Sequence, residues 1–260
     1  MTQPSLFVSH GAPDLLLSDT PARHFLAELG QKLARPDAIV IASAHHEAEG
    51  VAVRAPERFR TWHDFGNFDS RLFELCYEPP GDAALADEVM RLLDAAGLEP
   101  RRDESDLIDH GAWAPLSLLF SDADIPVVMV SIDPKRDSRW HERIGRALAP
   151  LRARNVLLIG SGSISHNLRA VFAPGSGDDI AWVEAFTSWL EDTIRRGDGD
   201  TLLDAMREAP DAARNHPTDE HLLPLFFAYG AGGGAAGRRL HHSYTWNVLA
   251  MDAYAFGEAA

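Results

Sequence analysis

Short apolar runs of strand length alternate along the chain with longer segments in which apolar residues recur at helical spacing. The short runs, bounded by turn residues, predict strands at 5–9, 38–43, 50–54, 125–132, 155–160 and 244–251. Apolar residues three and four positions apart predict helices over 20–33, 83–96, 138–153 and 180–195. Such alternation predicts an α/β fold with a mostly parallel central sheet covered by helices on both faces.

Loops are expected where glycine, proline, serine and aspartate gather, at 173–179, 197–200 and 230–237. None of these loops is long or biased enough to link two domains, and the chain shows no internal repeat. Residues 1–260 are therefore expected to form a single domain.

The composition narrows the classes of partner. The formal net charge of −15 disfavours nucleic acid and anionic membranes, because both are polyanions. The longest apolar runs, at 125–130 and 156–159, are far shorter than the ~20 residues of a membrane span. We see no basic n-region of a signal peptide, and the single cysteine, Cys76, excludes an internal disulfide. These features favour the cytoplasm, with the Cys76 thiol expected to be buried and inert; the oligomeric state stays open.

Three of the twelve histidines follow predicted core strands. His10, His45 and His166 each stand at or just past the carboxyl end of such a strand. Ligands bind at that edge of open α/β sheets, and imidazole is a common ligand of divalent metals. A backbone carbonyl could satisfy any one of these histidines, but three at equivalent places favour a metal site. The small residues at 160–163 suit close approach to a bound group.

Other histidines lie in segments that could contribute to the same site. His110 precedes a glycine and an apolar stretch, and His221 precedes another, where Thr218 could cap a helix. His63 lies in an aromatic loop, where it could position a substrate or bond to Asp64.

The remaining histidines carry less weight. His24 and His141 fall within helical stripes and are expected at the surface or partly packed. His46 should point to the opposite side of its strand from His45, and one of His241 and His242 could line the pocket. Motifs for a phosphate loop, a serine-hydrolase elbow and a zinc HExxH helix are absent from the sequence.

Nine motifs occur in an order that a known family shares. They are FVSHGAP (7–13), SAH (43–45), HDFG (63–66), YEPPG (77–81), DHGAWAPL (109–116), DADIPVV (122–128), SID (131–133), GSG with SHNL (160–168) and PTDEHLLPL (217–225). Over nearly its whole length the chain resembles the class III extradiol ring-cleavage dioxygenases, in their DOPA-dioxygenase-like branch. The resemblance implies one catalytic domain that opens a catechol ring with O2, a catechol and O2 being its small-molecule partners.

The resemblance also implies the roles of the histidines. His10, His45 and His221 would hold one divalent metal, with Fe(II) expected for activity and Zn(II) able to occupy an all-imidazole site. Many relatives carry a glutamate in place of His221, and Glu220 would be that carboxylate if the alignment shifted by one residue. His166 would be an acid/base residue and could also be a fourth ligand, and His110 would assist proton transfer.

Substrate choice is expected to lie in the loops that carry His63, Phe65 and Trp113, because aromatic and histidine side chains suit a flat phenolic ring. Two other functions stay open, since the same fold hosts different activities. One is a metal-binding signalling protein without oxygenase activity, and the other is a zinc hydrolase. The presence of both His110 and His166 favours the dioxygenase, because a metal-binding module needs no proton shuttle.

Overall fold

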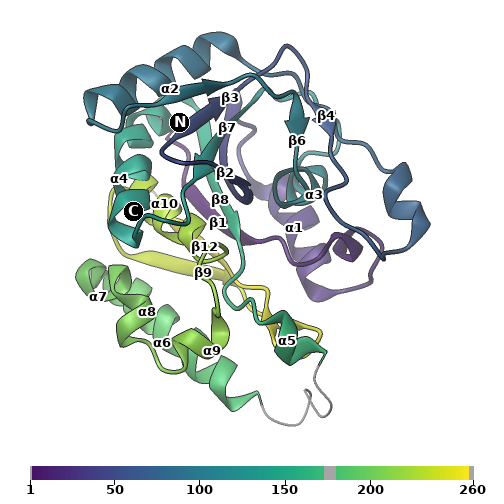
Figure 1. The fold of residues 1–260 in the computed structure, drawn as a ribbon, viewed down its shortest axis with the longest axis vertical. Helices are drawn as coiled ribbons and strands as arrows, with labels where there is room; N and C mark the ends of the chain where they lie inside the picture. Colours follow the sequence, from purple (N-terminus) through teal and green to yellow (C-terminus); the bar gives the residue numbers. More distant parts are fainter. Residues whose placement is uncertain (1, 173–179, 258–260) are drawn as a thin grey trace.

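An eight-stranded sheet runs through the part of the chain described by this computed structural model, residues 2–172 and 180–257 (Figure 1). The strand order is β5-β3-β7-β2-β8-β1-β12-β9. The bounds are β1 Ser5–Ser9, β2 Ala38–Glu47, β3 Ala52–Arg54, β5 Arg101–Asp103, β7 Val127–Ile132, β8 Val156–Gly162, β9 Gly237–His241 and β12 Ala253–Phe256. Two small sheets pair β4 (Arg60–Thr61) with β6 (Leu107–Ile108) and β10 (Tyr244–Thr245) with β11 (Leu249–Ala250).

The four central strands β7, β2, β8 and β1 are parallel, and the antiparallel strands β3 and β12 flank them. In the shared register, Ile41 of β2 pairs with Met129 on one side and Ile159 on the other. The predicted mostly parallel α/β sheet is therefore confirmed. Parallel strands end at the same edge, so the residues after β1, β2 and β8 come together there.

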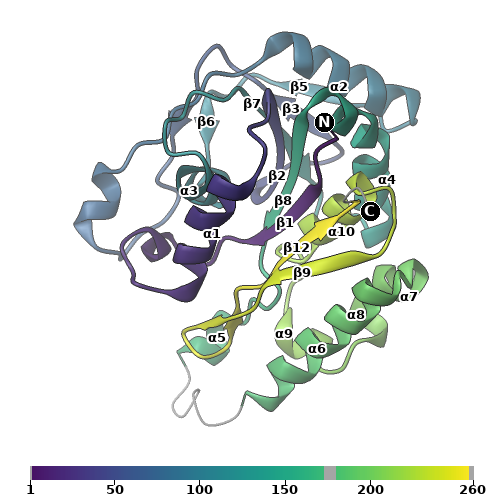
Figure 2. The same cartoon turned by 180° about the vertical axis from the view of Figure 1, so that it is seen from behind.

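Helices cover both faces of the sheet (Figures 1 and 2). In β1, Leu6 and Val8 pack with residues of α1 and α3, whereas Phe7 points to the other face, toward α6 and α10. This alternation follows from the two-residue period of a strand. The helices are α1 Pro21–Lys32, α2 Ala83–Ala95, α3 His110–Leu119, α4 Ser138–Leu148, α5 Leu168–Val171, α6 Ala181–Arg196, α7 Gly199–Leu203, α8 Ala205–Glu208, α9 Ala212–Asn215 and α10 Leu223–Ala231, with 3-10 turns at Pro13–Leu16, Ser70–Glu74 and Ala149–Arg154.

Several boundaries differ from the prediction. The predicted strand 244–251 is the hairpin of β10 and β11, because Trp246 and Asn247 turn the chain with positive φ. The α-helical part of 138–153 ends at Leu148 and continues as a 3-10 turn that contains Pro150. Residues 199–200 of the predicted loop 197–200 belong to α7, and residues 230–231 of the predicted loop 230–237 belong to α10. The predicted loop 173–179 lies outside the described residues.

Two side chains lie elsewhere than expected. Cys76 is exposed rather than buried, because the loop after the Ser70–Glu74 turn carries it at the surface. His141 is buried, with 1% of its surface exposed, because its ring packs against the backbone at the N-terminus of α4. Its Nδ1–H donates to the carbonyl of Asp137, and the backbone N–H of Asp133 donates to Nε2. Within the described residues, no helix is both long and apolar enough to cross a bilayer.

We predict that His141 makes stability depend on pH. Burial lowers the pKa of His141 from 6.5 to about 4, and protonation of Nε2 would oppose the Asp133 N–H donor. Between these two pH values the unfolded chain binds the extra proton, so the stabilisation is complete above pH 6.5 and is lost as pH falls toward 4. The loss should approach an order of 3 kcal/mol.

Urea unfolding of wild type and His141→Gln at several pH values measures this contribution. The variant should be less stable at pH 7 and show a shallower fall toward pH 4. Arg143→Gln, an exposed change on the same helix, serves as the control. Equal pH slopes for wild type and His141→Gln would contradict the assignment.

Candidate metal centre

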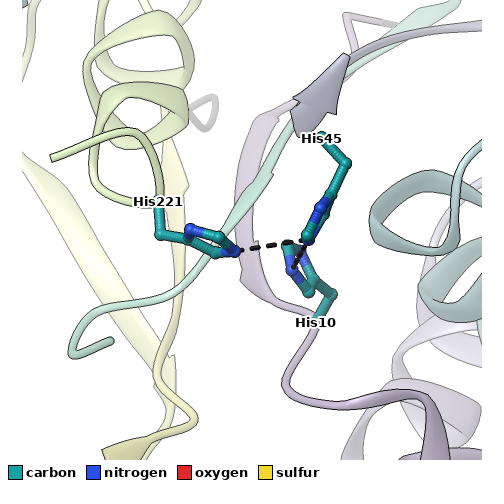
Figure 3. Close-up of side chains that lie close together, drawn as sticks. All are labelled: His10, His45 and His221. Atoms are coloured by element: carbon teal, nitrogen blue, oxygen red, sulfur yellow. Dashed lines mark hydrogen bonds between the residues drawn. The ribbon is translucent and has the colours of Figure 1, made fainter. Parts of the chain in front are cut away.

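Three histidines from distant parts of the chain direct their rings at one point (Figure 3). His10 follows β1, His45 lies near the end of β2, and His221 lies in the segment before α10. His45 Nε2 lies 3.3 Å from His10 Nε2 and 3.3 Å from His221 Nε2. One ring nitrogen from each can be chosen so that all three lie within 4.8 Å of one another, which is the spacing of ligands around a single metal ion.

Hydrogen bonds on the far side of the rings determine which nitrogens carry protons. The Ser161 hydroxyl donates to the Gly111 carbonyl, so its oxygen accepts from Nδ1–H of His10 at 3.0 Å. Nδ1–H of His221 donates in the same way to the Glu220 carboxylate at 3.0 Å. Both Nε2 atoms therefore present lone pairs toward His45.

The His45 Nε2 can donate a proton to only one of those two nitrogens. A metal ion satisfies all three lone pairs at once, and partners on the outer nitrogens are the usual way that proteins orient histidine ligands. The donor set therefore fits a metal ion.

Burial keeps these imidazoles neutral, as metal binding requires. It lowers the pKa of His10 and of His221 well below the ordinary value, and the neighbouring histidines lower each further. Burial lowers the pKa of His45 to about 4, with His110 adding to the effect. Buried Asp109, which has one carboxylate oxygen without a hydrogen-bond partner among the described residues, partly opposes the fall in the pKa of His45.

Glycines allow the histidines to approach. A Cβ on Gly111 would lie 2.8 Å from His45 Cδ2 and 3.1 Å from His10 Cε1. A Cβ on Gly162 would lie 2.1 Å from the His221 carbonyl, which instead accepts the N–H of Ser163. Gly160 and Gly162 thus admit the backbone at and just before the start of α10, while Ser163 lines the cavity described below.

His110 lies beside the three histidines and is held by Asp64. Asp64 Oδ1 accepts from the backbone N–H of His110 at 3.0 Å and from Nδ1–H at 2.9 Å. Its other oxygen lies 3.9 Å from His45 Nδ1. Burial raises the pKa of Asp64, but the hydrogen bonds from His110 outweigh this effect and lower it. With its proton on Nδ1, His110 has an acceptor at Nε2, to which none of the described residues donates a hydrogen bond.

His166 lies beside His221, whereas His110 lies beside His45. The His166 ring stacks on that of His221 with centroids 3.4 Å apart, and its Nδ1 lies 3.9 Å from Glu220 Oε1. Burial lowers the pKa of His166, although Glu220 partly opposes the shift. His166 is not part of the group of close ligand atoms formed by His10, His45 and His221, but it forms a second such group with Glu220 and His221.

A cavity of about 300 Å³ opens beside these histidines. His45, His110, His166 and His221 line it, together with Phe65. The other lining residues are Gly11, Ala12, Pro13, Phe68, Ser163, Leu168, Phe172, Trp246 and Leu249. The site is a small, mostly apolar pocket with a few convergent polar groups, as is usual for a small-molecule site.

The loop residues expected to contact a substrate fall in two places. Phe65 lines the cavity, whereas Trp113 is 1% exposed and donates its Nε1–H to the Trp62 carbonyl. His63 donates to the Leu75 carbonyl rather than to Asp64. The His63 and Trp113 rings lie beside Phe65, with centroids 5.7 and 6.4 Å from it. These two side chains therefore pack against Phe65 and do not themselves line the cavity.

Two further predictions, a helix cap at Thr218 and a cavity-lining histidine at 241 or 242, are wrong. Thr218 does not cap a helix, because α10 begins only at Leu223 with Leu222 as its N-cap. His241 stacks on Phe25 and His242 contacts Asp252, so neither lines the cavity.

His46 points away from His45 to Asp103, as the strand period predicts. Sequence reasoning missed Asp64, Ser161 and Trp246 as parts of the site. Only the position of Asp64 beside His63 signalled a role for any of them.

Residues 5–257 match the family described as the catalytic LigB subunit of aromatic ring-opening dioxygenase. The chain is 35% identical to the 4,5-DOPA dioxygenase extradiol of Beta vulgaris over 97% of this chain and 96% of that protein. It is 36% identical to the Escherichia coli protein of the same name, covering 89% and 86% of the two chains. The crystal structure of an uncharacterized Escherichia coli protein has a TM-score of 0.80 and 31% identity, and the match covers 98% of this chain and all of that chain.

We predict that Gly111→Ala weakens metal binding without unfolding the protein. The added methyl group would press on the rings of His45 and His10, whereas alanine suits the α3 backbone better than glycine. The metal dissociation constant, measured by competition with a chelator, should rise by about 10- to 100-fold. Gly66→Ala, where the added Cβ meets nothing within 4 Å, is the matched control. Equal affinities for the two variants would refute the steric argument.

Proposed function

Because the chain belongs to the family of catalytic LigB subunits of aromatic ring-opening dioxygenases and is an enzyme of extradiol catechol cleavage, we propose that His10, His45 and His221 hold its metal. The observation that carries the proposal is the convergence of two bare Nε2 lone pairs on His45 at the inner end of an apolar cavity. The small-molecule partners are a catechol and O2.

Iron(II) is the metal we propose. Imidazole ligands accept both Fe(II) and Zn(II), but zinc has no redox chemistry with which to activate O2. Bound Fe(II) would acidify the catechol hydroxyls and conduct electrons from the ring to oxygen. The Ser161 and Glu220 hydrogen bonds keep the lone pairs of His10 and His221 aimed inward whichever metal enters.

Two histidines are proposed to move protons on opposite sides of the ring. His110 donates Nδ1–H to Asp64, so its Nε2 is free to accept a proton from a catechol hydroxyl in the cavity. Burial favours the neutral form of His166, so it can accept a proton near neutral pH and later deliver it to the opened product. A further role for His166 as fourth metal ligand stays a prediction.

Phe65 is proposed to contact the substrate ring, since it lines the cavity and its centroid lies 5.8 Å from that of His110. His63 and Trp113 would act through Phe65 by fixing its position. The apolar walls exclude water from the reacting ring.

The metal proposal is tested by metal analysis of single alanine variants after anaerobic reconstitution with Fe(II). His10→Ala, His45→Ala and His221→Ala should each lose most of the bound iron and all ring opening. His24→Ala, an exposed histidine on α1, is the control and should bind iron as wild type does. Full iron retention in His45→Ala would remove that residue from the site.

Proton transfer is tested with His166→Gln and His110→Gln, assayed by oxygen uptake with a catechol across pH. Glutamine keeps a hydrogen-bonding amide but cannot act as a base, so each change should lower the rate by about 10²–10⁴-fold. Unchanged activity in His166→Gln would show that another group is the base. Stoichiometric iron in the wild type without oxygen uptake on any catechol would refute the dioxygenase function itself.

A further inference from the structure

The cavity extends from the buried histidines to a mouth that is open to solvent. Leu168 and Phe172, which line it, are 43% and 76% exposed and therefore mark this mouth. Half-buried Trp246 also lines the cavity, and its ring centroid lies 6.3 Å from that of Phe172. Aromatic rings at this distance contact each other, so the two side chains form one apolar wall at the mouth.

A second aromatic pair lies beside the histidines. Phe65, proposed above to contact the substrate ring, lies 5.8 Å from His110 and 5.6 Å from Phe68, and all three line the cavity. A catechol whose hydroxyls reach the histidines would therefore direct a ring substituent toward the mouth and along Trp246. Because the mouth is open, a charged group at the end of that substituent would stay in water. The wall would contact only the atoms next to the ring.

Trp246 is held at the mouth in an unfavourable backbone conformation. Its φ is +47°, a region that bulky residues rarely adopt, and Asn247 follows with φ +65°. The pairing of β10 with β11 imposes this turn, in which glycine would fit without steric cost. Conformations of this kind are common at ligand sites. The tryptophan therefore opposes the local backbone preference at a position where it lines the cavity.

Packing within the protein gives little compensation for this strain. The aromatic partner of Trp246 is Phe172, which remains 76% exposed, so their contact removes little apolar surface from water. A substrate atom placed on the indole would remove more of its surface from water. The strain and the weak internal contact together indicate that the ring serves a ligand.

We propose that Trp246 is a specificity-determining residue, whose indole contacts the first atoms of the substrate's ring substituent and thereby favours a substituted catechol over catechol itself. This inference rests on the proposed function and specifies which part of the substrate the mouth recognises. The contact requires no charge, so it serves amino-acid, carboxylic-acid and uncharged substituents alike. Its free energy comes from apolar atoms that leave water when they lie on the indole.

The test compares catechol with 4-propylcatechol, which differ only in an uncharged chain. With the iron-loaded wild type, kcat/KM for 4-propylcatechol should exceed that for catechol by about tenfold. Trp246→Gly should abolish most of this ratio, mainly through KM, because it removes a binding contact. Asn247→Gly is the matched control and should keep the ratio, since Asn247 shares the positive φ but is exposed and does not line the cavity.

Two further measurements separate substrate contact from a structural role. Calorimetry on zinc-loaded protein should give the same ratio of dissociation constants in the wild type and the same loss in Trp246→Gly, without turnover. Trp246→Asn, with a side chain that tolerates this backbone conformation, should lose the ratio as well. In urea, Trp246→Gly should unfold at a concentration no lower than wild type does, because relief of the strain offsets the lost packing.

A ratio that both substitutions of Trp246 leave as in wild type would overturn the inference. A lower urea midpoint in Trp246→Gly with that unchanged ratio would show that the indole serves packing alone. The two proposals fail in different ways. If the iron-loaded enzyme opens no catechol, the dioxygenase function fails, and the dissociation constants still decide the role of Trp246. If it opens both catechols and Trp246→Gly keeps their ratio, the function stands and the inference fails.

Discussion

The hydrogen bonds behind two imidazole rings decide what this cavity can bind. Ser161 and Glu220 hold protons on the outer nitrogens of His10 and His221, so bare lone pairs meet at His45 within 3.3 Å. Lone pairs so close together in a dry site repel one another unless a cation lies between them. The glycines beneath the rings and the carboxylates of Asp64 and Glu220 around them fit a cation at this point.

The same carboxylates connect the metal ligands with the residues proposed to transfer protons. Asp64 bonds His110 and faces His45, and Glu220 bonds His221 and faces His166. Each carboxylate thus contacts one proposed metal ligand and one histidine proposed to transfer protons. This arrangement orients both kinds of group through shared partners, so a change at either carboxylate would disturb binding and proton transfer together.

The fold supplies the inner end of the cavity, and peripheral segments supply its mouth. The parallel strands β1 and β2 end at one edge, which places His10 and His45 on either side of β8. The mouth comes from α5 and the turn between β10 and β11, which are far apart in sequence. The proposed metal ligands His10 and His45 therefore come from the sheet and the outer cavity wall from peripheral segments, a division that is usual for enzymes built on a common fold.

The sequence alone determined the central strands β1, β2, β7 and β8, their parallel arrangement and the histidines at strand ends, because hydrophobic periodicity and strand polarity are local properties. It did not predict the outer strands β5, β9 and β12. The tertiary structure decided what depends on distant partners. It buried His141, removed Trp113 from the cavity wall, and brought Asp64 to His110 and Ser161 to His10. It also turned 244–251 into a hairpin that carries Trp246 to the mouth. Such contacts join residues that are far apart in the chain and depend on how the elements pack across the sheet. The spacing of residues in the sequence carries no information about this packing.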